Sequence, residues 1–169
     1  MADQTAIDVN AEWRAFADEV GVVFLATQSE SGPVASYAPF VRDASGDLFI
    51  LISGLAAHHQ NLLDSPAAGA LIAESPDAAA NAFALKRLQL QVRAEPVPRD
   101  EDARHDAIAL LRRRFGKFVD TLDGLGDFTL FRLVPESGTY VRGFAQTWQL
   151  SGAGLAVATP VGPRQASDD

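Results

Sequence analysis

Three short apolar runs near the start of the chain are joined by turns alone, and this restricts the fold more than any other feature. The runs occupy residues 22–27, 33–41 and 48–53. The connections, Ser29-Glu-Ser-Gly32 and Asp43-Ala-Ser-Gly-Asp47, consist of residues that favour tight turns. Parallel strands would need long crossover connections, usually helices. The pattern therefore predicts hairpins in an antiparallel sheet and argues against a doubly wound α/β fold.

The rest of the chain adds strands with a few helices between them. We predict further strands at residues 68–74, 85–97, 127–134 and 139–150, the last two joined by a turn at 135–138. Helices are predicted at residues 8–20, 56–64 and 100–114. The expected fold is mainly β (α+β): a six- or seven-stranded antiparallel barrel with inserted helices. The strands around Leu48 and Val92 are expected to be central.

The domain organisation is simple. A chain of 169 residues has the length of one globular domain. We expect a single domain over residues 8–150. Residues 151–169 are rich in Gly, Pro and Ala, and we expect a flexible C-terminal tail there.

Composition excludes several classes of function. The chain has no cysteine, which excludes disulfides, thiolate metal sites and a cysteine nucleophile. Its net charge of −8 argues against nucleic acid or an anionic membrane as partner. The apolar runs are too short to span a bilayer, and the polar start at Met1 is unlike a signal peptide. We expect a cytoplasmic protein.

The most informative segment runs from Ser53-Gly54-Leu55 into the predicted helix that contains His58 and Asn61. A buried strand that ends in Ser-Gly before a helix directs free backbone N–H groups and a hydroxyl at one place, which suits an anion such as phosphate. His58 and Asn61 share a helix face and could add donors. The alternative is an ordinary strand-to-helix turn with solvated histidines.

Two further stretches are candidates for ligand contacts. Lys86 and Arg87 begin an alternating strand, where one of them could bind phosphate; equally, both could protect a sheet edge. Arg142, Phe144, Gln146 and Trp148 are predicted to share one strand face, which would suit a planar aromatic ligand or, alternatively, a core or subunit contact. No catalytic motif or metal-ligand pattern is found, so a bound cofactor is expected to supply any chemistry.

Three ordered stretches resemble one family. They are Ala35-Ser-Tyr-Ala-Pro-Phe40, Ser53-Gly-Leu-Ala-Ala-His-His-Gln-Asn-Leu62 and Phe83-Ala-Leu-Lys-Arg-Leu88. Together they resemble the pyridoxamine 5′-phosphate oxidase-like FMN-binding split barrels, and most closely the branch of HugZ-type haem-degrading proteins. The similarity extends from about Trp13 to about Leu150.

The resemblance implies a homodimer with FMN at the subunit interface. It places the flavin ring along Ser36, Tyr37 and Ala38. It places the phosphate near Ser53, Gly54, Leu55, His58, Asn61 and either Lys86 or Arg87. Gln146 and Trp148 of the partner strand would approach the ring. Ala57 and Leu85 stand where the branch usually has basic residues.

We therefore expect an FMN-dependent oxidoreductase that acts on a small molecule, with no catalytic residue assigned. One alternative is a haem-binding or haem-degrading protein of the HugZ type, and another is a non-catalytic flavin-binding module. Haem normally needs an axial ligand, and the chain has only three histidines, none after His105. With His58 assigned to phosphate, His59 is the least committed donor. We expect haem to bind weakly and not to be turned over.

Overall fold

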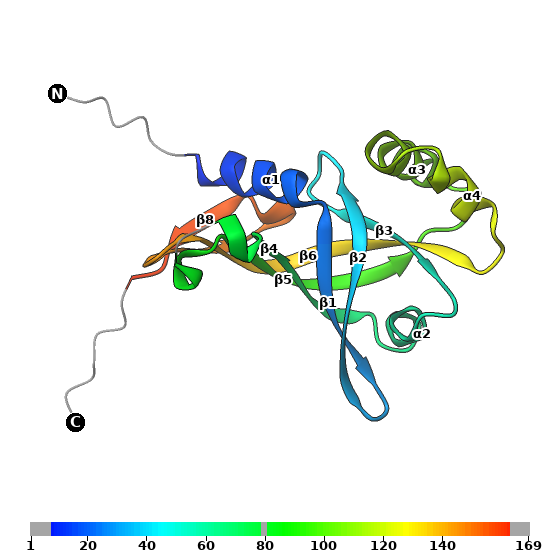
Figure 1. Ribbon diagram of the computed structural model, residues 1–169, viewed down its shortest axis with the longest axis horizontal. Coiled ribbons are helices and arrows are strands. Elements are labelled where there is room, and N and C mark those ends of the chain that lie inside the picture. The colour runs from blue at the N-terminus through cyan, green and yellow to red at the C-terminus, as the bar shows by residue number, and fades with distance from the viewer. Residues whose placement is uncertain (1–7, 79–80, 163–169) are drawn as a thin grey trace.

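An antiparallel sheet organises the structure, a computed structural model that describes residues 8–78 and 81–162. Within those residues the strands are β1 (Val22–Ser29), β2 (Gly32–Arg42), β3 (Leu48–Ser53), β4 (Ala67–Ala73), β5 (Arg87–Pro96), β6 (Phe128–Gly143), β7 (Gln146–Ser151) and β8 (Val157–Pro160). The helices are α1 (Val9–Val20), α2 (Ala57–Asp64), α3 (Asp102–Phe115) and α4 (Phe118–Gly124), with short 3-10 turns η1 (Pro76–Ala78), η2 (Ala82–Ala84) and η3 (Ala153–Leu155). The strand order is β3-β2-β1-β4-β5-β6-β7-β8 (Figure 1).

One additional pairing closes the sheet into a barrel. β3 also pairs with the first part of β6, from Ser53↔Phe128 to Leu48↔Leu133. The strands β3-β2-β1-β4-β5-β6 therefore form a closed six-stranded barrel, and β7 and β8 extend the sheet beyond it. The predicted six- or seven-stranded split barrel is confirmed, and within it the strands around Leu48 and Val92, β3 and β5, each pair with two neighbours.

The barrel interior is filled by alternate side chains of its strands, and two helices close its ends. α1 contributes Trp13, Phe16 and Ala17 to this core, and α2 contributes Leu62. α1 leads directly into the start of β1, whereas α2 contacts the end of β1 through a hydrogen bond from Asn61 Nδ2 to Thr27 Oγ1 (3.0 Å). The two helices thus cover opposite ends (Figure 1).

The boundaries of α1 follow from its capping residues. The carboxylate of Asp8 accepts hydrogen bonds from the backbone N–H groups of Asn10 and Ala11, as an N-cap does. Gly21 ends the helix in the left-handed conformation (φ 68°), which glycine adopts without strain. The sequence predicted both ends.

A second apolar cluster lies outside the barrel. α3 and α4 pack against the outer side of β2, β3 and β6, where Val41, Phe49, Ala107, Leu111 and Leu130 are buried together. Arg104 is buried in this layer and joins the two helices through an ion pair with Asp123. The sequence did not predict α4.

The predicted turn at residues 135–138 is wrong, because β6 continues through it. Pro135 and Ser137 pair with Val92 and Gln91 of β5, so the register shifts and Glu136 forms a bulge. Proline lacks a backbone N–H and is tolerated in a strand at such a bulge. Gly138 is needed for close packing, because an added Cβ would lie 2.7 Å from Leu90 Cδ2 and 3.0 Å from Gln89 O.

The hairpin turn lies instead at Phe144 and Ala145, between β6 and β7. Ala145 has a positive φ of 57°, as tight hairpin turns require. Arg142 therefore lies on β6 and Trp148 on β7. The predicted single strand face formed by Arg142, Phe144, Gln146 and Trp148 is wrong for this reason.

The segment predicted as a C-terminal tail contributes two elements to the fold. η3 buries Leu155 in the core, and β8 pairs with β7 from Trp148↔Pro160 to Ser151↔Val157. Residues 163–169, which also belong to the predicted tail, lie outside the described residues.

Candidate functional site

The junction between β3 and α2 has a tightly bonded backbone. Ser53 ends β3, and its hydroxyl donates a hydrogen bond to Asp127 Oδ2 (2.8 Å). The N–H of Gly54 donates to Asp127 O (2.7 Å), and the N–H of Leu55 donates to Ser53 Oγ (3.1 Å). The Ser53 hydroxyl and the N–H groups of Gly54 and Leu55, which the sequence assigned to an anion, are thus already engaged within the chain. Asp127 also places a carboxylate beside Ser53.

His58 and His59 differ in their surroundings on α2. His59 Nε2 lies 2.9 Å from Thr129 Oγ1, and its ring meets Phe131 edge-on at 5.6 Å. His58 is half-buried, and within the described residues its side chain makes no hydrogen bond or ion pair. Burial, followed by the nearby His59, lowers the pKa of His58 from its ordinary value of 6.5. Its imidazole is therefore neutral at pH 7. The prediction of His59 as the least committed donor is wrong, and His58 has that role.

Asn61 faces away from any surface ligand. Its side chain is buried and donates to Thr27 Oγ1 inside the barrel end. The shared helix face predicted for His58 and Asn61 therefore does not present two free polar groups. Leu55 is 92% exposed at the start of the junction, and Leu63 is exposed at the other end of α2. The α2 region therefore presents one half-buried neutral imidazole, at His58, and two exposed leucines, Leu55 before the helix and Leu63 near its end.

The predicted ring contacts on β2 point alternately to the two faces of the sheet. Ala38 is buried in the core, whereas Tyr37 is 65% exposed on the outer face and contacts Phe24 (ring centroids 6.4 Å apart). Ser36 Oγ is buried and has no hydrogen-bond partner among the described residues. Only the backbone of Ser36–Ala38 could follow a planar ligand.

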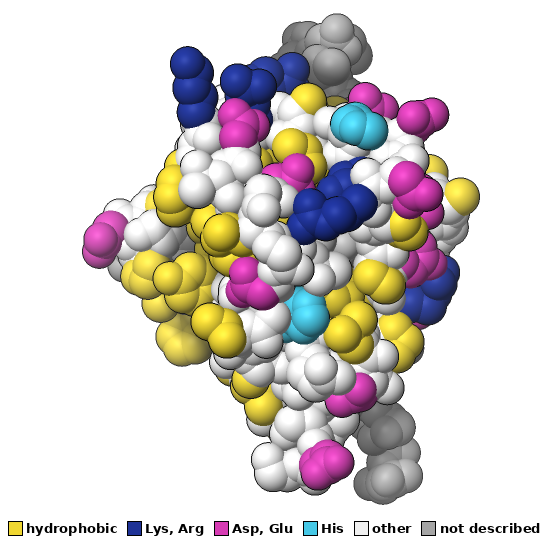
Figure 2. All heavy atoms as spheres, turned by 90° about the vertical axis from the view of Figure 1, so that its right-hand side faces the viewer, with side chains coloured by type: hydrophobic (Ala, Val, Ile, Leu, Met, Phe, Trp, Pro, Cys, Tyr) yellow, Lys and Arg dark blue, Asp and Glu magenta, His cyan; other side chains and the backbone are white. Residues whose placement is uncertain are grey.

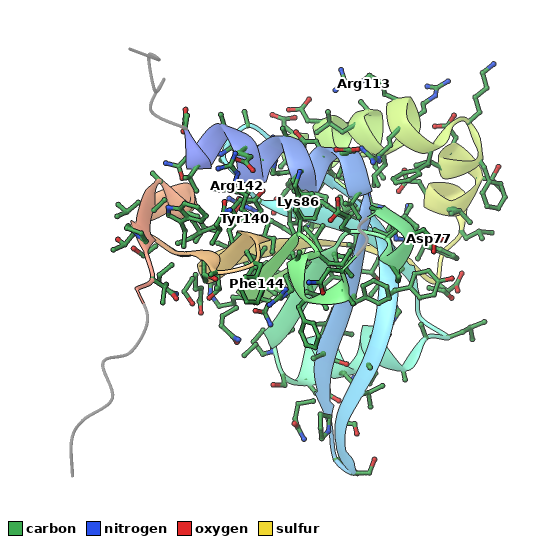
Figure 3. The ribbon with its side chains drawn as sticks, turned by 60° about the vertical axis from the view of Figure 1, so that its left-hand side comes forward. Asp77, Lys86, Arg113, Tyr140, Arg142 and Phe144 are labelled. Atoms are coloured by element: carbon green, nitrogen blue, oxygen red, sulfur yellow. The ribbon has the colours of Figure 1, made fainter. Side chains whose placement is uncertain are left out.

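Lys86 and Arg87 lie far from the α2 junction within one chain. Arg87 pairs with Val141 near the end of β6, whereas Ser53 pairs with Phe128 at its start. About 40 Å of strand separates the two positions at about 3.3 Å per residue. Lys86 lies instead near Tyr140, beneath α1 (Figure 3). One chain alone does not bring the predicted phosphate contacts together.

Near Lys86, hydrogen bonds between α1 and β6 hold the helix on the barrel. Glu12 Oε1 accepts hydrogen bonds from Tyr140 Oη (3.1 Å) and from Arg142 Nε (3.0 Å). Burial, then the charge of Glu12, raises the pKa of Tyr140 well above its usual range. Arg142 is therefore committed to an ion pair with α1. Of the remaining predicted contacts, Gln146 is exposed at the start of β7 and Trp148 is half-buried against the core.

The outer face of the barrel carries a row of uncharged side chains. Tyr37, Phe24, Leu71 and Gln89 are direct cross-strand neighbours on β2, β1, β4 and β5. Beside them, Ala26, Ala35, Gly69 and Gln91 line a shallow groove of about 310 Å³. This face was not predicted, although the alternation on β1 could have indicated it. Asp127 and Thr129 were also missed.

Comparison with known proteins establishes the family. Residues 9–142 match the family described as pyridoxamine 5′-phosphate oxidase. The chain belongs to this family. The match covers the barrel and all four helices, so the resemblance inferred from the sequence is confirmed.

Two relatives are heme oxygenases by name. The family member is 41% identical to Heme oxygenase HutZ of Vibrio cholerae over 145 residues, which cover 85% of this chain and 82% of HutZ. It is 30% identical to the chloroplastic non-canonical heme oxygenase HOZ of Arabidopsis thaliana, and that match covers 73% of this chain and 36% of HOZ.

Solved structures agree with the fold. The crystal structure of Vibrio cholerae HutZ, described as a heme storage protein, matches with a TM-score of 0.70 and 39% identity, over 77% of this chain and 92% of HutZ. Campylobacter jejuni ChuZ matches with a TM-score of 0.82 and 29% identity, over 95% of this chain and 65% of ChuZ.

These relatives correct the expected cofactor and function. The prediction of an FMN-dependent oxidoreductase is wrong, because HutZ, which is 41% identical over most of both chains, is named for haem in both comparisons. The ranking of haem below FMN as the cofactor is wrong for the same reason. Oxidoreductase chemistry itself agrees with the heme oxygenase name of HutZ, but dependence on flavin is not supported. In the described part of the chain, no helix is long and apolar enough to cross a membrane.

Proposed function

We propose that this protein binds haem and degrades it in a reaction of the haem oxygenase class. The observation that carries the proposal is the 41% identity to Heme oxygenase HutZ over 85% of this chain and 82% of HutZ. The wide coverage supports a shared activity better than a short motif would. The substrate would be haem itself, and bound haem supplies the iron at which oxygen is activated.

The donor groups of the chain fit haem. The sequence has no cysteine and a single methionine at Met1, so an axial ligand of the usual kinds must be a histidine. A histidine binds a metal through a neutral imidazole nitrogen. His58 meets both conditions, because burial keeps its ring neutral and no described residue bonds to it. His59 is held by Thr129, and His105 lies exposed on α3.

The residues around His58 would perform the remaining tasks of the site. Asp127 fixes the start of α2 through its bonds to Ser53 and Gly54, and this sets the position of the His58 ring. Leu55 and Leu63 offer apolar surface for a flat, largely apolar ligand. Half-burial of His58 limits the access of water to the donor nitrogen.

We further propose that the protein is a homodimer, in which a second copy covers the outer face around Phe24. Phe24 is 50% exposed and lies between Tyr37 and Leu71, and the eight residues of the groove and row carry no charge. An uncharged face of this kind can meet its own copy about a two-fold axis without placing like charges together. Such a dimer could also bring Lys86 or Arg87 of one copy towards the other copy.

The test is titration of the purified protein with haemin, followed by ascorbate and oxygen. We expect a Soret band that shifts on binding, and then its loss with release of iron and an open-chain tetrapyrrole. His58→Ala should shift the Soret maximum and weaken binding, whereas His105→Ala, on exposed α3, should match wild type. If His58→Ala leaves the spectrum unchanged and His59→Ala alters it, the assignment of the donor is wrong.

Haem storage is a second candidate, because the crystal structure of HutZ is described as that of a heme storage protein. The same assay separates the two functions. A Soret band that persists with ascorbate and oxygen would indicate storage and contradict degradation. A protein that does not bind haemin would contradict both.

A further inference from the structure

A basic and aromatic surface lies where α3 meets α4, away from the α2 site. It consists of Arg112, Arg113, Phe115, Lys117 and Phe118, and we call it the α3–α4 surface. All five residues are exposed, and Phe118 is 66% exposed. Figure 2 shows this side of the molecule, where Lys and Arg side chains gather along the upper edge beside hydrophobic ones.

The positive charge of this surface is only partly neutralised. Arg112 forms an ion pair with Asp120 (3.2 Å), which lies on α4. Among the described residues, the side chains of Arg113 and Lys117 form no ion pair or hydrogen bond. Arg104, Arg42 and Arg132, by contrast, are each paired with an aspartate. Two free cations therefore lie on this one surface in a chain whose net charge is −8.

The cations border a groove that has an apolar floor. Arg113 and Lys117 line a groove of about 460 Å³ between α3 and α4, together with His105, Ile108 and Ala109. Arg114 belongs to another environment, because its guanidinium donates to the carbonyls of Asp18 and Glu19 at the end of α1. Of the basic residues around this groove, Arg112 is paired with Asp120 and Arg114 is bonded to the end of α1. Arg113 and Lys117 remain free for a partner.

The exposed phenylalanines favour a protein as the occupant. A small anion would satisfy Arg113 and Lys117 but would leave Phe115 and Phe118 in water. A protein surface with carboxylates around an apolar contact covers both kinds of side chain, as a polar rim around an apolar centre does. The remaining, acidic surface of this chain would repel such a partner and so direct it to this place.

We infer that the α3–α4 surface docks an acidic electron-donor protein. Docking depends on the free cations and exposed aromatics, whereas the electron-donor role rests on the proposed function. Degradation of haem consumes electrons, and this chain has no cysteine with which to supply them. In that role the donor's reduced flavin loses one electron at each encounter and the haem-loaded protein gains it, with no bond made or broken.

Binding is tested first without haem, using a fluorescently labelled flavodoxin as the acidic probe. Arg113→Gln with Lys117→Gln removes both free cations. We expect this variant to bind flavodoxin at least about tenfold more weakly at low ionic strength, because surface charges mainly steer association. The difference should vanish near 1 M salt, where the screening length is about 3 Å. Phe118→Ser should weaken binding at every salt concentration.

A matched control carries the same change in net charge elsewhere. Gln28→Glu with Ser31→Glu also makes the protein more acidic by two charges, but on the exposed β1–β2 hairpin. It should bind flavodoxin nearly as wild type does. Equal binding by wild type and the Arg113/Lys117 variant would overturn the inference. So would an equal loss in the control, since net charge alone would then explain the effect.

The electron-donor role is tested by comparing two reductants on the haem-loaded protein. The Arg113/Lys117 variant should degrade haem at the wild-type rate with ascorbate and at least about tenfold more slowly with reduced flavodoxin at low ionic strength. Equal rates with flavodoxin would contradict this role. If wild type fails even with ascorbate, the proposed function fails, while the binding experiment still decides the docking surface.

Discussion

Removal of the exposed ring of Phe24 should dissociate the proposed dimer. Phe24 is 50% exposed on the outer face of the barrel. A phenylalanine buries about 200 Å² when fully covered, so about 100 Å² remains for a partner to cover. At about 25 cal/mol per Å², this area contributes about 2.5 kcal/mol in each subunit. Two-fold symmetry doubles the contribution to about 5 kcal/mol, so Phe24→Ala should weaken dimerisation by roughly three to four orders of magnitude.

Sedimentation over a wide range of concentrations measures this effect. Wild type should have the mass of two subunits, and Phe24→Ala should approach the mass of one at micromolar concentration. Phe118→Ala removes an even more exposed ring from α4, outside the proposed interface, and should leave the mass unchanged. A wild-type mass of one subunit at all concentrations would refute the dimer. A variant that dimerises as wild type does would show that the partner lies elsewhere.

Three further substitutions test the structure itself. His58→Gln should reduce the loss of unfolding free energy that occurs between pH 7 and pH 5. Burial lowers the pKa of His58, so the unfolded chain binds more protons than the folded chain does. Wild-type stability therefore falls as the pH falls below 6.5. Gly21→Ala should cost about 1–2 kcal/mol, because φ is +68° and the new Cβ would meet the Arg114 guanidinium. Arg104→Leu should cost about 2–3 kcal/mol, less than a fully buried pair, because Asp123 is partly exposed. Urea denaturation measures all three.

Each of these substitutions has a control in the same chain. Gly124→Ala places a methyl group in open space without a positive φ and should be neutral or slightly stabilising. Arg93→Leu breaks exposed ion pairs with Glu95 and Glu136 and should cost far less stability than Arg104→Leu does. For the pH experiment, the matched control is His105→Gln, which replaces an exposed histidine on α3 and is measured in the same way. A control that loses as much stability as its test variant would contradict the corresponding argument.

The parts of the fold that depend on local pattern were predictable. The capped helix that ends at Gly21 and the first two hairpins follow from alternation and turn residues within about ten positions of one another. The structure departs from the prediction where contacts with a segment that is distant in the sequence determine the local conformation. Pro135 and Gly138 are residue types that favour turns, but here β6 pairs with β5 on both sides of them. Pro135 therefore lies next to a bulge, and Gly138 lies in close contact with β5.

The candidate site was predictable only in its location. The junction that begins at Ser53 is visible in the sequence as a strand that meets a helix. Its hydrogen bonds were not, because Asp127 and Thr129 reach Ser53 and His59 only through the pairing of β3 with β6, some 70 residues away in the chain. That pairing closes the barrel, and no local pattern encodes it. Whether each histidine is free to bind a ligand therefore depends on contacts that only the folded chain reveals.

Those contacts change the chemistry that the junction can perform. Free N–H groups after a strand attract an anion, but here Gly54 and Leu55 already donate to Asp127 and to Ser53 within the chain. A phosphate at this place would have to displace these bonds and approach the carboxylate of Asp127. Among the described residues the His58 side chain is left without a partner, and its neutral imidazole has a free nitrogen lone pair but no positive charge to attract an anion. A neutral imidazole without a partner is suited to a ligand that carries a metal, and among the groups that the sequence suggested, haem has that character.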